Sequence, residues 1–224
     1  MLVAIMLVCT LIGPQDVSLK AAFGGSAVDG ATNPDYEILV RVRIPRVLLA
    51  AMVGAALAGS GVVFQALLRN PLADPYILGV SSGAGLGAMI AVIAGLSWTL
   101  WGRSPIAVFA FLGALSTVWL VWGIGHVTGK YQVTGLLLAG VVVNAFFSAM
   151  IMFLVSVAKS NQLHATLFWL MGNMTEEDFF VLWIGGGSIV AGLTALFFLG
   201  PQLNIISVGV QDARSIGVPV ARVE

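Results

Sequence analysis

Residues 47–68 read VLLAAMVGAALAGSGVVFQALL, a run that contains no Asp, Glu, Lys, Arg or His. An α-helix needs roughly 20 apolar residues, at about 1.5 Å each, to cross about 30 Å of hydrocarbon. Uncharged runs of similar length follow at residues 80–100, 104–125, 135–158 and 179–200. The sequence therefore predicts an all-α, polytopic integral membrane bundle with one helix in each run.

The composition of the 224 residues agrees with a membrane location. Hydrophobic residues make up 59% of the chain and charged residues 9%, and the mean hydropathy is +1.02. Ten basic and ten acidic side chains cancel, so there is no basic surface to favour nucleic acid. With Cys9 as the single cysteine and only His126 and His164, neither an intrachain disulfide nor a metal site is expected. We predict no cofactor and no catalytic residues.

The first apolar stretch, residues 1–13, is too short to span, because 13 residues reach only roughly 20 Å. We interpret it as the rear part of a first span. A signal peptide is the alternative, but no Lys or Arg precedes the stretch and no small-residue cleavage site follows it.

Two local patterns predict how the spans are connected and packed. Asn70, Pro71, Asp74 and Pro75 form two X-Pro steps, which favour a tight, rigid reversal between spans. An ordinary turn is all that these residues require. Small residues recur within the spans and predict close packing of helices in lipid. They are Gly54, Ala58, Gly61, the GxxxG pair Gly83 and Gly87, Gly185, Gly186, Gly187 and Ser188.

The uncharged spans also limit the possible functions. Ion-coupled carriers and proton pumps bind their ion with ionisable groups at membrane depth. The five runs contain no such group, and Asn144 is the only strongly polar side chain deep within one of them. A secondary carrier and an intramembrane enzyme are both disfavoured. A passive pore, or a permease that is energised by another subunit, remains.

The distribution of basic residues conflicts with the simplest topology. If the amino terminus is cytoplasmic, Arg41, Arg43 and Arg46 face the outside. Membrane proteins usually hold such clusters on the cytoplasmic side.

Several motifs resemble the FecCD-like permeases of bacterial ABC importers for ferric siderophores, haem and cobalamin. The resemblance begins near residue 35 and extends over nearly all of the remaining chain. The matching segments are RIPR (43–46), GAALAGSG (54–61), QALLRNPLADP (65–75), LGVSSGA (78–84), LLLAGV (136–141), FWLMG (168–172), and LN through ARSIGV (203–218).

The resemblance implies a multi-pass permease of ten spans in a bacterial or archaeal cytoplasmic (inner) membrane. It implies a second permease subunit, identical or closely homologous, an ABC ATPase, a periplasmic or lipid-anchored substrate-binding protein, and membrane lipid as partners. Arg43 and Arg46 would dock the binding protein from the external segment 14–46, which would account for the charge conflict. A lipid headgroup anchor is the alternative for these arginines.

The resemblance also implies a gate and a coupling segment. The cytoplasmic gate would lie at Val133 and Thr134, where Val133 departs from the small hydroxyl residues of the family and favours closure by bulk. A plain connecting loop is the alternative there. The cytoplasmic segment 201–224 would contact the ATPase through a short helix that Gly209 begins and Gly217 with Pro219 stops. An interfacial amphipathic segment is the alternative. The expected contacts are Asp212, Ala213, Arg214, Ser215 and Gly217.

Family members continue for about four more spans, so the chain resembles an incomplete permease domain over residues 1–224. The leading prediction is the transmembrane subunit of an ABC importer for a metal chelate, with ATP hydrolysis on a partner. A truncated, non-transporting remnant or membrane scaffold is the first alternative, and an ion-coupled carrier is the second. No residue distinguishes siderophore from haem or cobalamin, because Ala, Gly, Val and Phe can line a pathway or pack helices alike.

Overall fold

A computed structural model describes residues 1–24, 33–96, 105–127, 133–172, 174, 179–215 and 217. Helices are the regular structure throughout this described part, which confirms the all-α class. The chain divides into two compact units. Unit 1 comprises Met1–Ser60 and Met174–Pro201, and unit 2 comprises Gly61–Asn173 and Gln202–Glu224.

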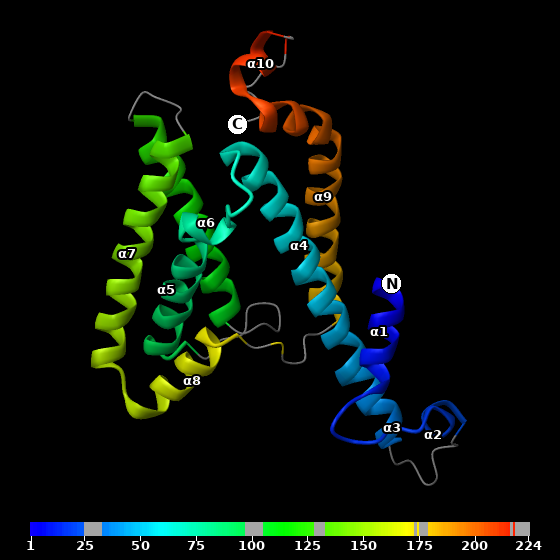
Figure 1. Cartoon of the computed structure of the whole chain (residues 1–224). Coiled ribbons are helices and arrows are strands. Elements are labelled where there is room, and N and C mark those ends of the chain that lie inside the picture. Colours follow the sequence, from blue (N-terminus) through cyan, green and yellow to red (C-terminus); the bar gives the residue numbers. More distant parts are fainter. Residues whose placement is uncertain are drawn as a thin grey trace. The chain divides into compact units, whose positions relative to one another are not determined.

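Two long helices, α4 and α9, each contribute to both units. Each of the other elements belongs to one unit only. Figure 1 labels the α-helices in chain order. The elements of unit 1 are α1 (Leu2–Leu11), α2 (Leu19–Gly24), α3 (Pro34–Tyr36) and the π-helix η2 (Glu37–Arg43), beside α4 (Ile44–Leu68) and α9 (Phe179–Val208). Those of unit 2 are the 3₁₀ helix η3 (Pro75–Leu78), α5 (Val80–Ile93), α6 (Pro105–Val127), α7 (Val133–Val157), α8 (Ser160–Leu170) and α10 (Val210–Ser215).

Four of the five predicted spans form helices that are long and apolar enough to cross a membrane. They contain or overlap the predicted runs, and their bounds are Pro34–Leu68, Pro105–Gly125, Gly135–Val157 and Leu182–Val208. The last one passes the predicted end at residue 200, because α9 continues through Pro201 to Val208. Leu203 and Ile206 are buried in this extension, so packing stabilises a helix that the proline alone would disfavour.

The predicted span 80–100 is wrong in length, because α5 has only 14 residues and ends at Ile93. Gly95 adopts a left-handed φ of 60°, and its N–H bonds to the carbonyl of Val92, while the N–H of Leu96 bonds to that of Ala91. This pair of bonds is the Schellman motif, which satisfies carbonyls at a helix end. A 14-residue helix is roughly 21 Å long, which is shorter than the hydrocarbon layer.

Helix α5 is the centre of unit 2 and contacts α6, α7 and α8. Most of its residues are buried, among them Gly83, Gly87 and Met89. The apolar cluster beside it joins α5 to α6 and α7, and consists of Leu86, Val121, Ala139, Val143 and Phe147.

The predicted GxxxG pair sits at the closest contact between α5 and α6. A Cβ added to Gly83 would lie 1.8 Å from Oγ1 of Thr117, and one added to Gly87 would lie 2.1 Å from the backbone oxygen of Phe109. A Cβ at Gly113 of α6 would lie 2.1 Å from the backbone oxygen of Gly83. The two backbones therefore approach to a distance that only glycine permits, as the sequence predicted for Gly83 and Gly87.

In unit 1, α4 and α9 pack through Gly186, which the sequence predicted, and through Gly59, which it did not. A Cβ at Gly59 would lie 2.3 Å from Leu193, and one at Gly186 would lie 2.7 Å from Met52. By contrast, the predicted glycines Gly54, Gly61, Gly185 and Gly187 have no described atom within 4 Å of an added Cβ. The sequence identified helices rich in small residues, but their rotation selects which glycine packs.

We expect Gly113→Ala to destabilise the protein by about 1–3 kcal/mol, because the new methyl group must push the backbones of α5 and α6 apart. The matched control is Gly123→Ala on the same helix, where an added Cβ meets no atom within 4 Å. The thermal unfolding midpoint in detergent, followed by fluorescence-detected gel filtration, measures the difference. Equal midpoints for the two variants would contradict the close contact.

Candidate functional site

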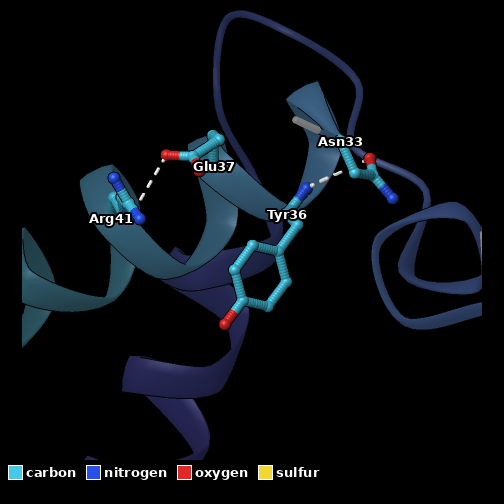
Figure 2. A network of polar contacts seen from close by, with 4 residues as sticks. All are labelled: Asn33, Tyr36, Glu37 and Arg41. Carbon is cyan, nitrogen blue, oxygen red and sulfur yellow. Dashed lines mark hydrogen bonds and ion pairs between the residues drawn. The ribbon is translucent and has the colours of Figure 1, made fainter. Parts of the chain in front are cut away.

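The segment before α4 is built from short helices with local caps. Asn33 begins α3, and its Oδ1 accepts hydrogen bonds from the N–H groups of Asp35 and Tyr36 at 3.1 and 3.4 Å. In the π-helix that follows, Glu37 and Arg41 form an ion pair of 3.1 Å, which Figure 2 shows beside Asn33 and Tyr36. The Arg41 side chain is 70% exposed, so this pair contributes at most about 1 kcal/mol.

Arg43, the first of the two predicted docking residues, is buried at the end of this π-helix, with 8% of its surface exposed. Its Nη1 donates to the carbonyl oxygens of Thr10 and Leu11 at 3.3 and 2.9 Å. Its Nη2 donates to the carbonyl oxygen of Gln15. The guanidinium group of Arg43 thus contacts the end of α1, a placement that the sequence analysis did not expect.

Arg46, the second predicted docking residue, lies in different surroundings. It is exposed, and its Nε donates to the backbone oxygen of Met174 at 3.0 Å. The structure therefore does not present the two arginines as a matched pair: Arg46 is open to a partner and Arg43 is not.

Side-chain hydrogen bonds stabilise the Asn70–Pro75 reversal. Oδ1 of Asn70 accepts from the N–H of Leu72 at 2.9 Å, and Oδ1 of Asp74 accepts from the N–H of Tyr76 at 2.8 Å. Pro71 follows Asn70 directly, and Pro75 begins η3. These two Asx turns fix the backbone where α4 stops.

The chain after this reversal packs against the middle of α7. A Cβ at Gly140 would lie 2.8 Å from the carbonyl oxygen of Ile77, and one at Gly79 would lie 3.0 Å from Cβ of Asn144. Asn144 is the eleventh residue after Val133, so this contact lies roughly 16 Å along α7. The 3₁₀ helix η3 and Gly79, which lead into α5, are therefore covered by the middle of α7.

The predicted gate residues Val133 and Thr134 form the first turn of α7. The structure describes their backbone, whereas their side chains and residues 128–132 lie outside the described part. The helix that begins at the predicted gate is thus the one that receives η3 at Gly140 and Asn144.

The predicted coupling helix is present as α10 (Val210–Ser215). The N–H of Ala213 bonds to the carbonyl of Gly209 at 2.9 Å, and Oδ2 of Asp212 lies 2.8 Å from the position of a Cβ on Gly209. Ser215 is exposed, and Gly217 has a left-handed φ of 85°, as expected for a helix stop. The side chain of Arg214 and residue Pro219 lie outside the described part.

Helix α10 packs against the rest of unit 2 through an apolar cluster. Ala213 and Ile206 are both fully buried, and Leu67 and Ile205 pack against them. Leu67 belongs to the last turn of α4, just before the Asn70–Pro75 reversal. Ala213 is therefore an anchor of α10 and faces the protein.

Comparisons with known proteins identify the group to which these features belong. The FecCD transport family matches residues 1–224. The chain belongs to this family.

Three relatives illustrate the range of the FecCD family. The cobalamin import system permease protein BtuC of Halobacterium salinarum is 35% identical over 205 residues, with 92% of this chain and 54% of that protein covered. The hemin transport system permease protein HmuU of Yersinia pestis is 32% identical, with coverages of 98% and 65%. A solved ABC transporter assigned to the metal-chelate type, in an inward-facing conformation, matches with a TM-score of 0.77 and 27% identity over 99% of this chain and 68% of that one. The chain thus spans between about half and two thirds of the length of these curated relatives.

Two contacts in unit 2 are evident from the structure and not from membership in the FecCD family. Gln162 of α8 donates from Nε2 to the carbonyl oxygens of Val92 and Ile93, both at 3.2 Å, and so caps α5. Gly140 admits η3 to α7. The sequence analysis missed both residues, although the position of Gly140 within LLLAGV was a signal that could have pointed to it.

The contact of η3 with α7 predicts that Gly79→Ala costs more stability than Gly95→Ala. Both glycines have positive φ, at 73° and 60°, so each alanine variant should cost about 1–2 kcal/mol from backbone strain. Only Gly79 also faces α7, which should add about 1–3 kcal/mol of overpacking. Thermal unfolding midpoints in detergent measure both effects, and an equal loss in the two variants would contradict the contact.

Proposed function

We propose that this chain is the permease subunit of an ABC importer that moves a metal chelate across the cytoplasmic membrane. Membership in the FecCD family supports the transport role, and the match to a metal-chelate type transporter supports the substrate class. The observation on which the proposal chiefly depends is α10, a short helix fastened by Ala213 to the ends of α4 and α9. Such a helix can receive a push from a separate motor.

The proposal assigns the energy source to a partner. The five long apolar runs contain no Asp, Glu, Lys, Arg or His, so they offer no group that could bind a coupling ion. Work must then enter from outside the membrane. ATP hydrolysis on a separate ABC ATPase supplies it in the proposed mechanism.

In the proposed mechanism the ATPase meets the outer side of α10. Asp212 and Ser215 are exposed, and they lie on the same short helix as buried Ala213. We assign Asp212, Arg214, Ser215 and Gly217 to the motor contact and Ala213 to the internal anchor. Closure of the ATPase dimer moves α10, and the anchor passes the movement to Leu67 at the end of α4.

The gate in this mechanism is the start of α7 at Val133 and Thr134. The end of α4 leads directly into the Asn70–Pro75 reversal, and η3 then packs on α7 at Gly140. A shift of the α4 end therefore has a continuous protein path to the helix that begins at the gate. Val133 favours closure by apolar bulk and dewetting.

The substrate-binding protein is proposed to dock at the external end of α4 through Arg46. This side chain is exposed, and an acidic partner surface would complement its charge. A second permease subunit, identical or homologous, would complete the pathway.

The coupling proposal predicts that Ala213→Leu uncouples the transporter. The larger side chain cannot fit beside Ile206 without about 1–3 kcal/mol of strain, so α10 should detach from α4. We expect at least about a tenfold loss of binding-protein-stimulated ATPase activity in the reconstituted complex, since tenfold corresponds to about 1.4 kcal/mol. The matched control is Ala195→Leu, at an exposed position of α9.

The same assay separates the proposed function from its alternatives. A truncated remnant or scaffold would copurify with no ATPase that responds to a loaded binding protein. An ion-coupled carrier would keep transporting without ATP and stop when the ion gradient collapses. Either result would contradict the importer proposal.

The docking proposal predicts that Arg46→Glu lowers the affinity for the binding protein about tenfold at low salt, and less at high salt, because the charges are screened. The control is Arg69→Glu, an exposed arginine just past the other end of the 25-residue helix α4. Surface plasmon resonance on the detergent-solubilised protein measures both variants. An affinity that is independent of Arg46 would remove the docking assignment.

A further inference from the structure

We propose that Arg43 is an internal latch, which fastens the end of α1 to the start of α4. The Arg43 latch comprises the guanidinium group of Arg43, the carbonyls of Thr10, Leu11 and Gln15, and the backbone of Gly13. The assignment of Arg46 depends on the proposed function, whereas the latch itself does not.

The acceptors of the latch are carbonyls that a helix end leaves without partners. Helix α1 ends at Leu11, and Ile12 is extended with φ −91° and ψ 131°. The last carbonyls of a helix have no N–H of their own helix to accept from, and they carry the negative end of the helix dipole. Arg43 supplies N–H donors and a positive charge to Thr10 and Leu11 at this end. One side chain thereby satisfies two otherwise unpaired carbonyls.

Gly13 gives a second, independent sign that this contact is built into the sequence. A Cβ on Gly13 would lie 2.6 Å from Nη2 and 2.7 Å from Cζ of Arg43. The backbone of Gly13 is not in the positive φ region that favours glycine, since the structure's positive-φ glycines lie elsewhere in the described residues. Glycine is therefore required at position 13 for the close approach of Arg43, and not for the shape of the turn.

The chemistry of the latch requires arginine and not merely a positive charge. A guanidinium group is planar and offers five N–H donors in a fixed fork, so it can reach several carbonyls at once. The ammonium group of lysine is compact and strongly hydrated, and it would have to lose its water at this position, where Arg43 is only 8% exposed. Arg43→Lys should consequently keep the charge but lose most of the latch.

The π-helix η2 explains why neighbouring arginines diverge. The N–H of Ile44 bonds to the carbonyl of Leu39, five residues back, in the wide turn that ends η2. Arg41 and Arg43 both lie within this turn, where Arg41 is exposed and Arg43 is buried, and Arg46 is exposed after it. The motif Arg43-Ile44-Pro45-Arg46 thus divides its two cations between an internal contact and an external surface.

The test compares Gly13→Ala, Arg43→Gln and Arg43→Lys with the control Arg46→Gln in the full chain in detergent. Trypsin cleavage after Lys20, an exposed residue of α2, reports opening of the segment that the latch holds. Cleavage is followed by the mass of the released fragment, because Arg43→Gln and Arg46→Gln each remove one other trypsin site, whereas Arg43→Lys keeps one. The rate of such cleavage tracks local opening of the backbone.

The latch predicts that Gly13→Ala and Arg43→Gln each raise the cleavage rate at Lys20 about tenfold, an ordinary range for local opening. Arg43→Lys should reverse less than half of the rise in cleavage rate that Arg43→Gln causes. Arg46→Gln should leave the rate unchanged. The double variant Gly13→Ala with Arg43→Gln should cleave no faster than Arg43→Gln alone, because both changes break one contact.

Two results would overturn the latch. One is a cleavage rate for Arg43→Gln that equals that of Arg46→Gln, and the other is an additive effect of Gly13→Ala on the Arg43→Gln background. Failure of the proposed transport function would appear separately, as absence of binding-protein association in every variant, and would leave the cleavage rates as predicted. Should Arg43→Gln fail to fold, Gly13→Ala and Arg43→Lys carry the same comparison.

Discussion

Backbone polar groups in a lipid bilayer have to be paired within the protein, and the rest of this structure depends on that constraint. The apolar runs meet it by forming helices, which pair every interior N–H and C=O group. The backbone groups at helix ends lack partners within the helix, and polar side chains form hydrogen bonds with several of them. These side chains are Gln162 at the end of α5, Arg43 at the end of α1, and Asn33 at the start of α3. Polar residues are few in this chain, and the need to pair helix ends explains the positions of these three.

Close backbone packing is the second consequence of the lipid environment. Without water there is little hydrophobic drive between helices, so contact area and fit decide which surfaces associate. Helix α5 illustrates this, because Gly83 and Gly87 let it touch the backbone of α6 while Leu86 joins the cluster shared with α7. The short helix α5 is thereby held in place by its neighbours.

The proposed transport mechanism places its movable parts away from this tight centre. Helix α10 contacts the rest of unit 2 through Ala213 and the apolar residues Ile206, Leu67 and Ile205. The Asn70–Pro75 reversal is stiff because two Asx turns and two prolines restrict it. In the proposed mechanism, α10 moves first, and the stiff Asn70–Pro75 reversal then transmits the movement from the end of α4 to α7.

The sequence by itself determined the membrane class, four of the long helices, the reversal at Asn70 and Asp74, and the short helix that stops at Gly217. These features depend on local composition and on the backbone preferences of single residues, which can be recognised without knowing what lies nearby. The tertiary structure alone decided that Gly59 and not Gly54 packs, that η3 lies against Gly140, and that Arg43 turns inward while Arg46 stays exposed. Each of these depends on the rotation and depth of one helix against another, which the fit of whole surfaces sets and no local pattern encodes.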